Sequence, residues 1–171
     1  MIAELEHWHD FYLLVGTAGA TLLALLFVAV SLGVGFLTEE RAAATRTFYS
    51  PIIIHFACVF FIAAIATVPA HRSMFFAALI GATALVGAVI SAFITVELIR
   101  REWTQYVRDY LAYGLLPEIG YLALFAAAGL IYKESIYALD LLAGALLLLL
   151  LINIRNTWDL MLSMVRHAKR D

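Results

Sequence analysis

Polar and ionisable side chains that interrupt long apolar stretches are the first candidates for chemistry in this sequence. The main candidates are His55, Glu97, Glu118, Asn153 and Arg155. Ionisable groups inside a membrane are costly, and those that persist usually mark ion or proton pathways. An imidazole can also change its charge near neutral pH. The five residues therefore predict a buried network near one end of the helices that binds an ion or relays protons.

Three of these residues also have a purely structural interpretation. Glu97 can pair with the arginines three and four positions later on a helix. Glu118 follows Pro117, and an acidic residue in a first helical turn complements the helix dipole. Arg155 can extend its head group to the membrane surface and pair with Asp159. The other two candidates have no comparable local partner.

Histidines near the N-terminus form a second candidate site. His7, His9 and His71 are predicted to lie on the same side of the membrane, and histidine suits Zn²⁺, Cu²⁺ or haem iron. However, residues two apart on a helix point about 200° away from each other, so His7 and His9 cannot share an ion in a helix. The alternative interpretation is an interfacial collar, in which Trp8 and Tyr12 anchor the first helix at headgroup depth.

Composition places the chain among integral membrane proteins. Hydrophobic residues make up 64% of the 171 residues and charged residues only 14%, whereas soluble domains have about 25% charged residues. No catalytic motif is present, so we do not expect an enzyme. The chain has no basic run for nucleic acid, and its single cysteine, Cys58, allows no intrachain disulfide. No cofactor is required by any of these patterns.

The apolar runs predict an all-α fold, a single transmembrane domain over residues 1–171 with five spanning helices. A run of 18 or more apolar residues is long enough to cross a bilayer core of about 30 Å. The predicted spans are 11–37, 48–68, 74–99, 115–132 and 136–158.

The distribution of lysine and arginine predicts the orientation of these helices. In a five-span arrangement, two basic residues fall on the N-terminal side and nine on the other side. Because basic residues accumulate in the cytoplasm, we expect the N-terminus outside and the C-terminus inside, in the plasma membrane of a cell or the inner membrane of a bacterium. Trp103, Tyr106, Tyr110 and Tyr113 share one helical face, which predicts a short interfacial helix over 101–113 before the fourth span.

Small residues repeat at helical spacing in the first and third predicted helices. Such faces allow close helix contacts in membranes, either within one chain or between copies of it. They also suit the wall of a water-filled path. The residues are Gly16, Thr17, Ala20, Thr21, Gly87, Ser91 and Thr95.

Taken together, these features predict a membrane-embedded homo-oligomer that acts as a channel or small transporter for ions or small solutes. Buried polar groups without a catalytic motif favour this function, and small subunits commonly assemble into closed rings. The first alternative is a non-transporting accessory subunit of a larger membrane complex, since small-residue faces also suit a different partner. The second is an extracytoplasmic metal or haem binder that uses the N-terminal histidines. In each case the surrounding partner is membrane lipid.

Overall fold

The structure is a computed structural model that describes residues 7–33, 39–68, 73–100 and 110–168, without the side chains of 32–50, 98 and 163–168. This part of the chain is helical and contains no strand, which confirms the predicted all-α class. Its elements are α2 (His9–Gly33), α3 (Glu39–Ala66), α4 (Ser73–Arg100), the π-helical turn η2 (Leu111–Leu115), α6 (Leu116–Tyr132) and α7 (Ala138–Ala168).

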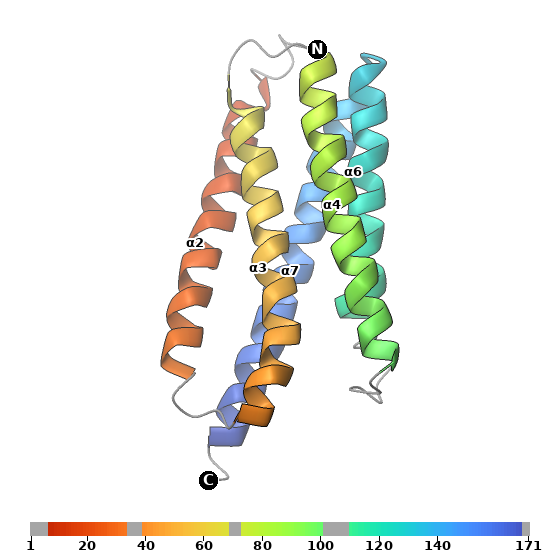
Figure 1. Ribbon diagram of the computed structural model, residues 1–171. Coiled ribbons are helices and arrows are strands. Elements are labelled where there is room, and N and C mark those ends of the chain that lie inside the picture. Colours follow the sequence, from red (N-terminus) through yellow and green to blue (C-terminus); the bar gives the residue numbers. More distant parts are fainter. Residues whose placement is uncertain (1–6, 34–38, 69–72, 101–109, 169–171) are drawn as a thin grey trace.

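The five long helices run up and down in one elongated bundle (Figure 1). The closest pairs are α2 with α3, α4 with α6, and α6 with α7. Helix α3 also contacts α4 and α7, so it lies between the two outer groups of helices. Helices α2, α4 and α7 end at the end of the bundle where the chain terminates (Figure 1), here called the C-terminal end. Helix α3 and η2 begin at that same end.

Four helices of the described chain are long and apolar enough to cross a bilayer, as expected of an integral membrane protein. Their spanning segments are His9–Ser31, Ser73–Glu97, Leu111–Tyr132 and Ala138–Leu162. Helix α3 contributes a shorter apolar stretch, Pro51–Ala66. Large apolar side chains on the outer surface, such as Phe93 and Leu14, suit contact with lipid tails.

The fourth predicted span begins earlier than expected. Residues 101–109, which include Trp103 and Tyr106 of the predicted interfacial helix, lie outside the described residues. From Tyr110 onward the chain is helical and continues through η2 into α6. Tyr113 was expected at the membrane interface, but its ring is buried in the bundle, only 6% exposed.

Small residues bring α2 close to α3. A Cβ atom on Gly16 would lie 3.2 Å from the Cβ of Ala63, and one on Gly19 would contact the backbone of Phe60. Close approach of this kind is how membrane helices associate when lipid offers no hydrophobic driving force.

Tyr12 joins the N-terminal end of α2 to α7. This side chain is fully buried, and its hydroxyl donates a hydrogen bond of 3.3 Å to the carbonyl of Leu139. Tyr12 therefore joins α2 to α7 and does not form part of an aromatic collar facing lipid.

Candidate functional site

A buried hydrogen bond between α3 and α6 lies at the centre of the bundle. The hydroxyl of Tyr121 and Nδ1 of His55 are 2.5 Å apart, and both side chains are at most 1% exposed. A polar group that is deprived of water is costly unless it is hydrogen-bonded, so the imidazole and the phenol hydroxyl satisfy each other.

Gly87 of α4 makes room for the Tyr121 ring. A Cβ atom at this position would overlap the ring carbons Cε1 and Cζ of Tyr121. The absence of a side chain thus lets the ring pass against α4 and carry its hydroxyl to α3. Through this one side chain, α3, α4 and α6 meet at the same level.

The π-helical turn η2 lies just before Pro117 and reflects the backbone hydrogen bonds that this proline interrupts. Proline has no N–H, so Pro117 cannot donate to a carbonyl of the preceding turn. The N–H of Leu116 donates to Leu111, five residues back, instead of to Ala112. The carbonyl of Ala112 therefore has no backbone donor from either Leu116 or Pro117. Neighbouring side chains commonly satisfy carbonyls freed in this way in membrane helices.

Asn156 of α7 satisfies the free carbonyl of Ala112. Its Nδ2 atom donates to this carbonyl at 2.9 Å, and the Asn156 side chain is 1% exposed. In return, the hydroxyl of Tyr113 donates to the backbone carbonyl of Asn156 at 3.1 Å. A similar but longer contact joins η2 to α4, where Ser91 Oγ lies 3.5 Å from the carbonyl of Gly114.

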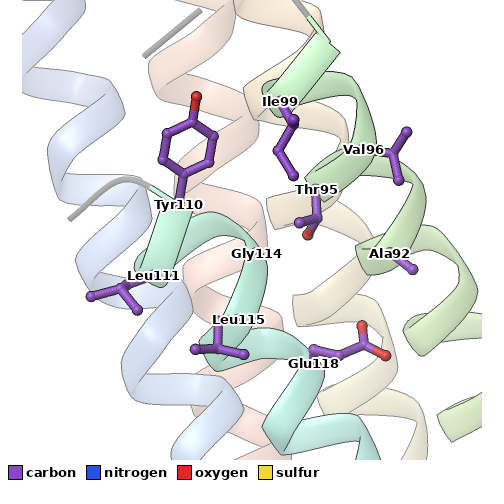
Figure 2. Close-up of a pocket in the computed structure, with 9 residues that line it drawn as sticks. All are labelled: Ala92, Thr95, Val96, Ile99, Tyr110, Leu111, Gly114, Leu115 and Glu118. Carbon is purple, nitrogen blue, oxygen red and sulfur yellow. The ribbon is translucent and has the colours of Figure 1, made fainter. Parts of the chain in front are cut away.

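Glu118 lies one turn before Tyr121 on α6 and borders an open groove. The groove has a volume of about 640 Å³ and lies between α4 and the η2–α6 segment. Figure 2 shows Tyr110 at one end of it and Glu118 at the other, with the Glu118 carboxylate directed towards α4. The Oε2 atom of Glu118 is buried and has no hydrogen-bond partner. Because η2 precedes α6 without a break, Glu118 does not cap a free helix N-terminus, and that structural explanation fails.

Three further polar side chains on α7, Asn153, Arg155 and Thr157, each have a buried atom without a hydrogen-bond partner. Arg155 donates through Nη1 to Oδ1 of Asn156, and its guanidinium carbon lies 6.0 Å from the centre of the Tyr113 ring. Its Nη2 atom is buried without a partner. Asn153 is fully buried and donates to the carbonyl of Leu149 at 2.9 Å, while its Oδ1 atom has no partner.

The five predicted network residues are spread over four helices, with Glu97 in the last turn of α4. His55 pairs with Tyr121. Asn153 and Arg155 lie on α7, and Glu118 borders the groove beside α4. Within the described residues, none of these four hydrogen-bonds another of the predicted set. Their joint role as an ion or proton network stays a prediction.

Sequence reasoning missed Tyr121 as a member of the site. Its signal was a phenol within an otherwise apolar run of α6. A buried tyrosine hydroxyl usually finds a partner, but the sequence does not say which helix supplies it.

The predicted small-residue stripes are largely used for packing within the chain. Gly87 receives Tyr121, and Thr95 lies against Gly114, where an added Cβ atom would come within 2.7 Å of Thr95 Oγ1. In α2, Gly16 faces α3, Ala20 is half-buried and Thr17 and Thr21 are exposed. A second role for these residues in an oligomer or along a pore stays a prediction.

The predicted histidine site is not tested, because His71 lies outside the described residues. His7 and His9 are exposed at the start of α2. Among the side chains that the structure describes, no group of three or more His, Cys, Asp or Glu residues is arranged to hold a metal ion.

Searches of family models, curated proteins and solved structures found no match to this chain.

Proposed function

We propose that this protein is a small transporter that moves protons or other small cations, with five spanning helices and the C-terminus in the cytoplasm. The four long apolar helices support a membrane location. The fifth crossing is supported by α3, which lies antiparallel to α2 and α4 and contacts α2, α4 and α7. A segment packed among spanning helices is shielded from lipid, so it needs fewer apolar residues than its neighbours.

The unsatisfied carboxylate oxygen of Glu118 is the observation that carries the proposal. Nearly all buried polar atoms in native proteins have partners, so each exception requires an explanation. A carboxylate that borders a groove can take a cation or a proton from it, which provides the missing partner. Tyr121 and the His55 imidazole follow one turn later, and both can accept and donate a proton.

The distribution of buried polar groups favours a transporter over an open channel. The buried polar side chains of the described chain are His55, Ser91, Asn153 and Asn156. Ser91 and Asn156 lie in the second halves of α4 and α7, the helices that end at the C-terminal end of the bundle, and His55 and Asn153 lie near the middle of α3 and α7. The opposite end is packed with apolar side chains such as Ile62, Ile80 and Ile131, and the buried hydroxyl of Tyr12 is already hydrogen-bonded there to Leu139. A cation that reached Glu118 would therefore need a conformational change to continue, as in alternating access.

A homo-oligomer remains part of this proposal. Thr17 and Thr21 are exposed on α2, and the hydroxyl of Thr21 donates to the carbonyl of Thr17 in its own helix. Small hydroxyl side chains of this kind allow a second helix to approach closely. A second copy of the chain is the expected partner of this face.

Proton flux into liposomes tests the proposal. Purified protein is reconstituted with a trapped pH-sensitive dye, and a potassium gradient with valinomycin supplies the driving voltage. We expect acidification faster than in protein-free liposomes, and its loss in Glu118→Gln, which keeps the side-chain shape but removes the charge. The matched control is Glu134→Gln, at the exposed turn between α6 and α7. Flux that is equal in wild type and Glu118→Gln would remove Glu118 from the mechanism.

The same liposomes decide whether transport occurs at all. If neither protons nor Na⁺ nor K⁺ cross faster than in protein-free vesicles, the transporter proposal is wrong. Co-purification of a stoichiometric protein partner from native membranes would then favour the accessory role.

A further inference from the structure

The polar atoms that line the groove between α4 and α6 are mainly hydrogen-bond acceptors. Glu118 borders the groove with its carboxylate, of which the Oε2 atom is buried without a partner. The hydroxyl proton of Thr95 is used on the carbonyl of Ser91 at 3.0 Å, so its oxygen faces the groove with lone pairs only. Among the described residues, the lining contains no lysine, arginine or histidine.

The groove therefore has the chemistry of a cation site in an apolar wall. Its remaining side chains are apolar, apart from Tyr110 at the end opposite Glu118 (Figure 2). The aromatic face of a tyrosine also attracts cations. A ligand with N–H donors and a positive charge would satisfy Glu118, and an apolar body would cover the leucine, isoleucine and valine side chains.

The size and position of the groove also suit such a ligand. Its volume of about 640 Å³ falls within the range of roughly 300–1,000 Å³ that is typical of small-molecule sites. Ile99 and Leu115 on its two walls are more than half exposed on the outer surface of the bundle. Since that surface faces lipid in a spanning bundle, a ligand can enter from the bilayer without crossing the apolar core.

From these features we infer that the groove binds a protonated amphipathic amine, a free molecule with one ammonium group and an apolar body. The ammonium lies at Glu118, and the body lies between α4 and η2. A phospholipid amine fits less well, because its phosphate would find no basic side chain among the described residues of the lining. This inference names a substrate class for the proposed transporter and shares with it only the role of Glu118.

Direct binding tests the inference without any transport assay. The protein is placed in phosphatidylcholine nanodiscs, and n-octylammonium is titrated while bound ligand is measured by NMR saturation transfer. We expect saturable binding to the wild type and about a tenfold loss of affinity in Glu118→Gln, because a hydrogen bond to a charged group is lost. Glu134→Gln, far from the groove, is expected to bind as the wild type does.

Two further ligands and one variant separate the contribution of charge to binding from the contribution of apolar contact. Octanol carries the same chain without a charge, and octyltrimethylammonium carries the charge without N–H donors, so both are expected to bind more weakly. Ala92→Phe fills the groove from the α4 wall and should abolish binding while leaving Glu118 unchanged. Octanol binding as tightly as octylammonium, or octylammonium binding equally to wild type and Glu118→Gln, would overturn the inference.

The remaining outcomes distinguish a free amine from a lipid amine, and the binding inference from the transporter proposal. If nanodiscs that contain phosphatidylethanolamine compete away octylammonium, the amine comes from the lipid and the free-ligand inference is wrong. Proton flux without amine binding would overturn the inference and leave the transporter standing. Amine binding without any flux would support the inference and count against the transporter.

Discussion

The side-chain amide of Asn156 on α7 donates a 2.9 Å hydrogen bond to the backbone carbonyl of Ala112, the carbonyl that Pro117 leaves without a backbone donor. This contact explains how a proline is tolerated inside an apolar helix. The helix widens into a π-turn, and an amide from the neighbouring helix replaces the missing N–H. Asn156 thus fixes the rotation of α7 relative to the start of α6, and with it the positions of the side chains around the groove.

Replacement of Asn156 by leucine should therefore destabilise the bundle through the Ala112 carbonyl. An unsatisfied buried acceptor costs about 1–3 kcal/mol. In a Pro117→Ala background, the restored N–H can bond within the helix, so the same replacement should cost about 1 kcal/mol less. Stability can be read from the labelling rate of the single cysteine, Cys58, which is buried in the folded chain. An equal cost in both backgrounds would show that Asn156 does not compensate for the proline.

Addition of a methyl group at Gly87 should separate α4 from α6. The new Cβ atom would overlap the Tyr121 ring, and overpacking of this kind costs about 1–3 kcal/mol. Displacement of the ring would also lengthen its hydrogen bond to His55. The matched control is Gly129→Ala on α6, where nothing lies within 4 Å of the added atom, and helix propensity alone should leave stability equal or slightly higher. Similar melting temperatures for the two variants would contradict the close contact at Gly87.

Removal of the Tyr121 hydroxyl should destabilise the fold, because the buried imidazole of His55 then loses its hydrogen-bond partner. Tyr121→Phe keeps the ring against Gly87 but leaves Nδ1 of His55 without this partner, with an expected loss of about 1–3 kcal/mol. The ¹⁵N chemical shifts of the imidazole should change as well, since the tautomer depends on this hydrogen bond. Tyr132→Phe on the same helix is the control, because that side chain is 65% exposed. Unchanged imidazole shifts in Tyr121→Phe would exclude the hydrogen bond.

Replacement of Glu118 by methionine should make the protein more stable while it reduces function. The change removes an oxygen that is buried without a partner, so the free energy of unfolding should rise by about 1 kcal/mol. Residues kept for function are often unfavourable for stability in this way. Thermal unfolding of the two proteins in the same detergent, followed at Cys58, measures the difference. A clear loss of stability in Glu118→Met would mean that the carboxylate has a structural partner in the folded protein.

The sequence was sufficient to predict the helices because apolar length is a local property. The predicted spans 74–99 and 136–158 overlap α4 and α7 closely, and the latter extends further, to Ala168. The predicted fourth span, 115–132, agrees with α6, but the helical path starts earlier, through η2. In the structure a π-turn allows the helix to begin before the proline. No local pattern in the sequence signals that turn.

The partners of the buried polar groups could not be predicted for a different reason. His55 and Asn153 were singled out because they interrupt apolar runs, and both are buried. Which group each one meets depends on how its helix is rotated against helices far away in the chain. The hydrogen bond from His55 to Tyr121 joins residues 66 positions apart. Rotation is fixed by contacts such as Gly87 with Tyr121, which exist only once the bundle has formed.

The positions of the two chain ends provide a test of the fifth crossing. If α3 crosses the membrane, the number of crossings is odd and the ends lie on opposite sides; if it does not, they lie on the same side. In a Cys58→Ala background, we expect His7→Cys to react with a membrane-impermeant maleimide in intact bacterial cells, because this position is exposed near the predicted outer surface. A green fluorescent protein fused to the C-terminus should fluoresce, since it folds only in the cytoplasm. Labelling at position 7 only after the cells are broken, together with a fluorescent fusion, would place both ends inside and remove α3 from the spanning helices.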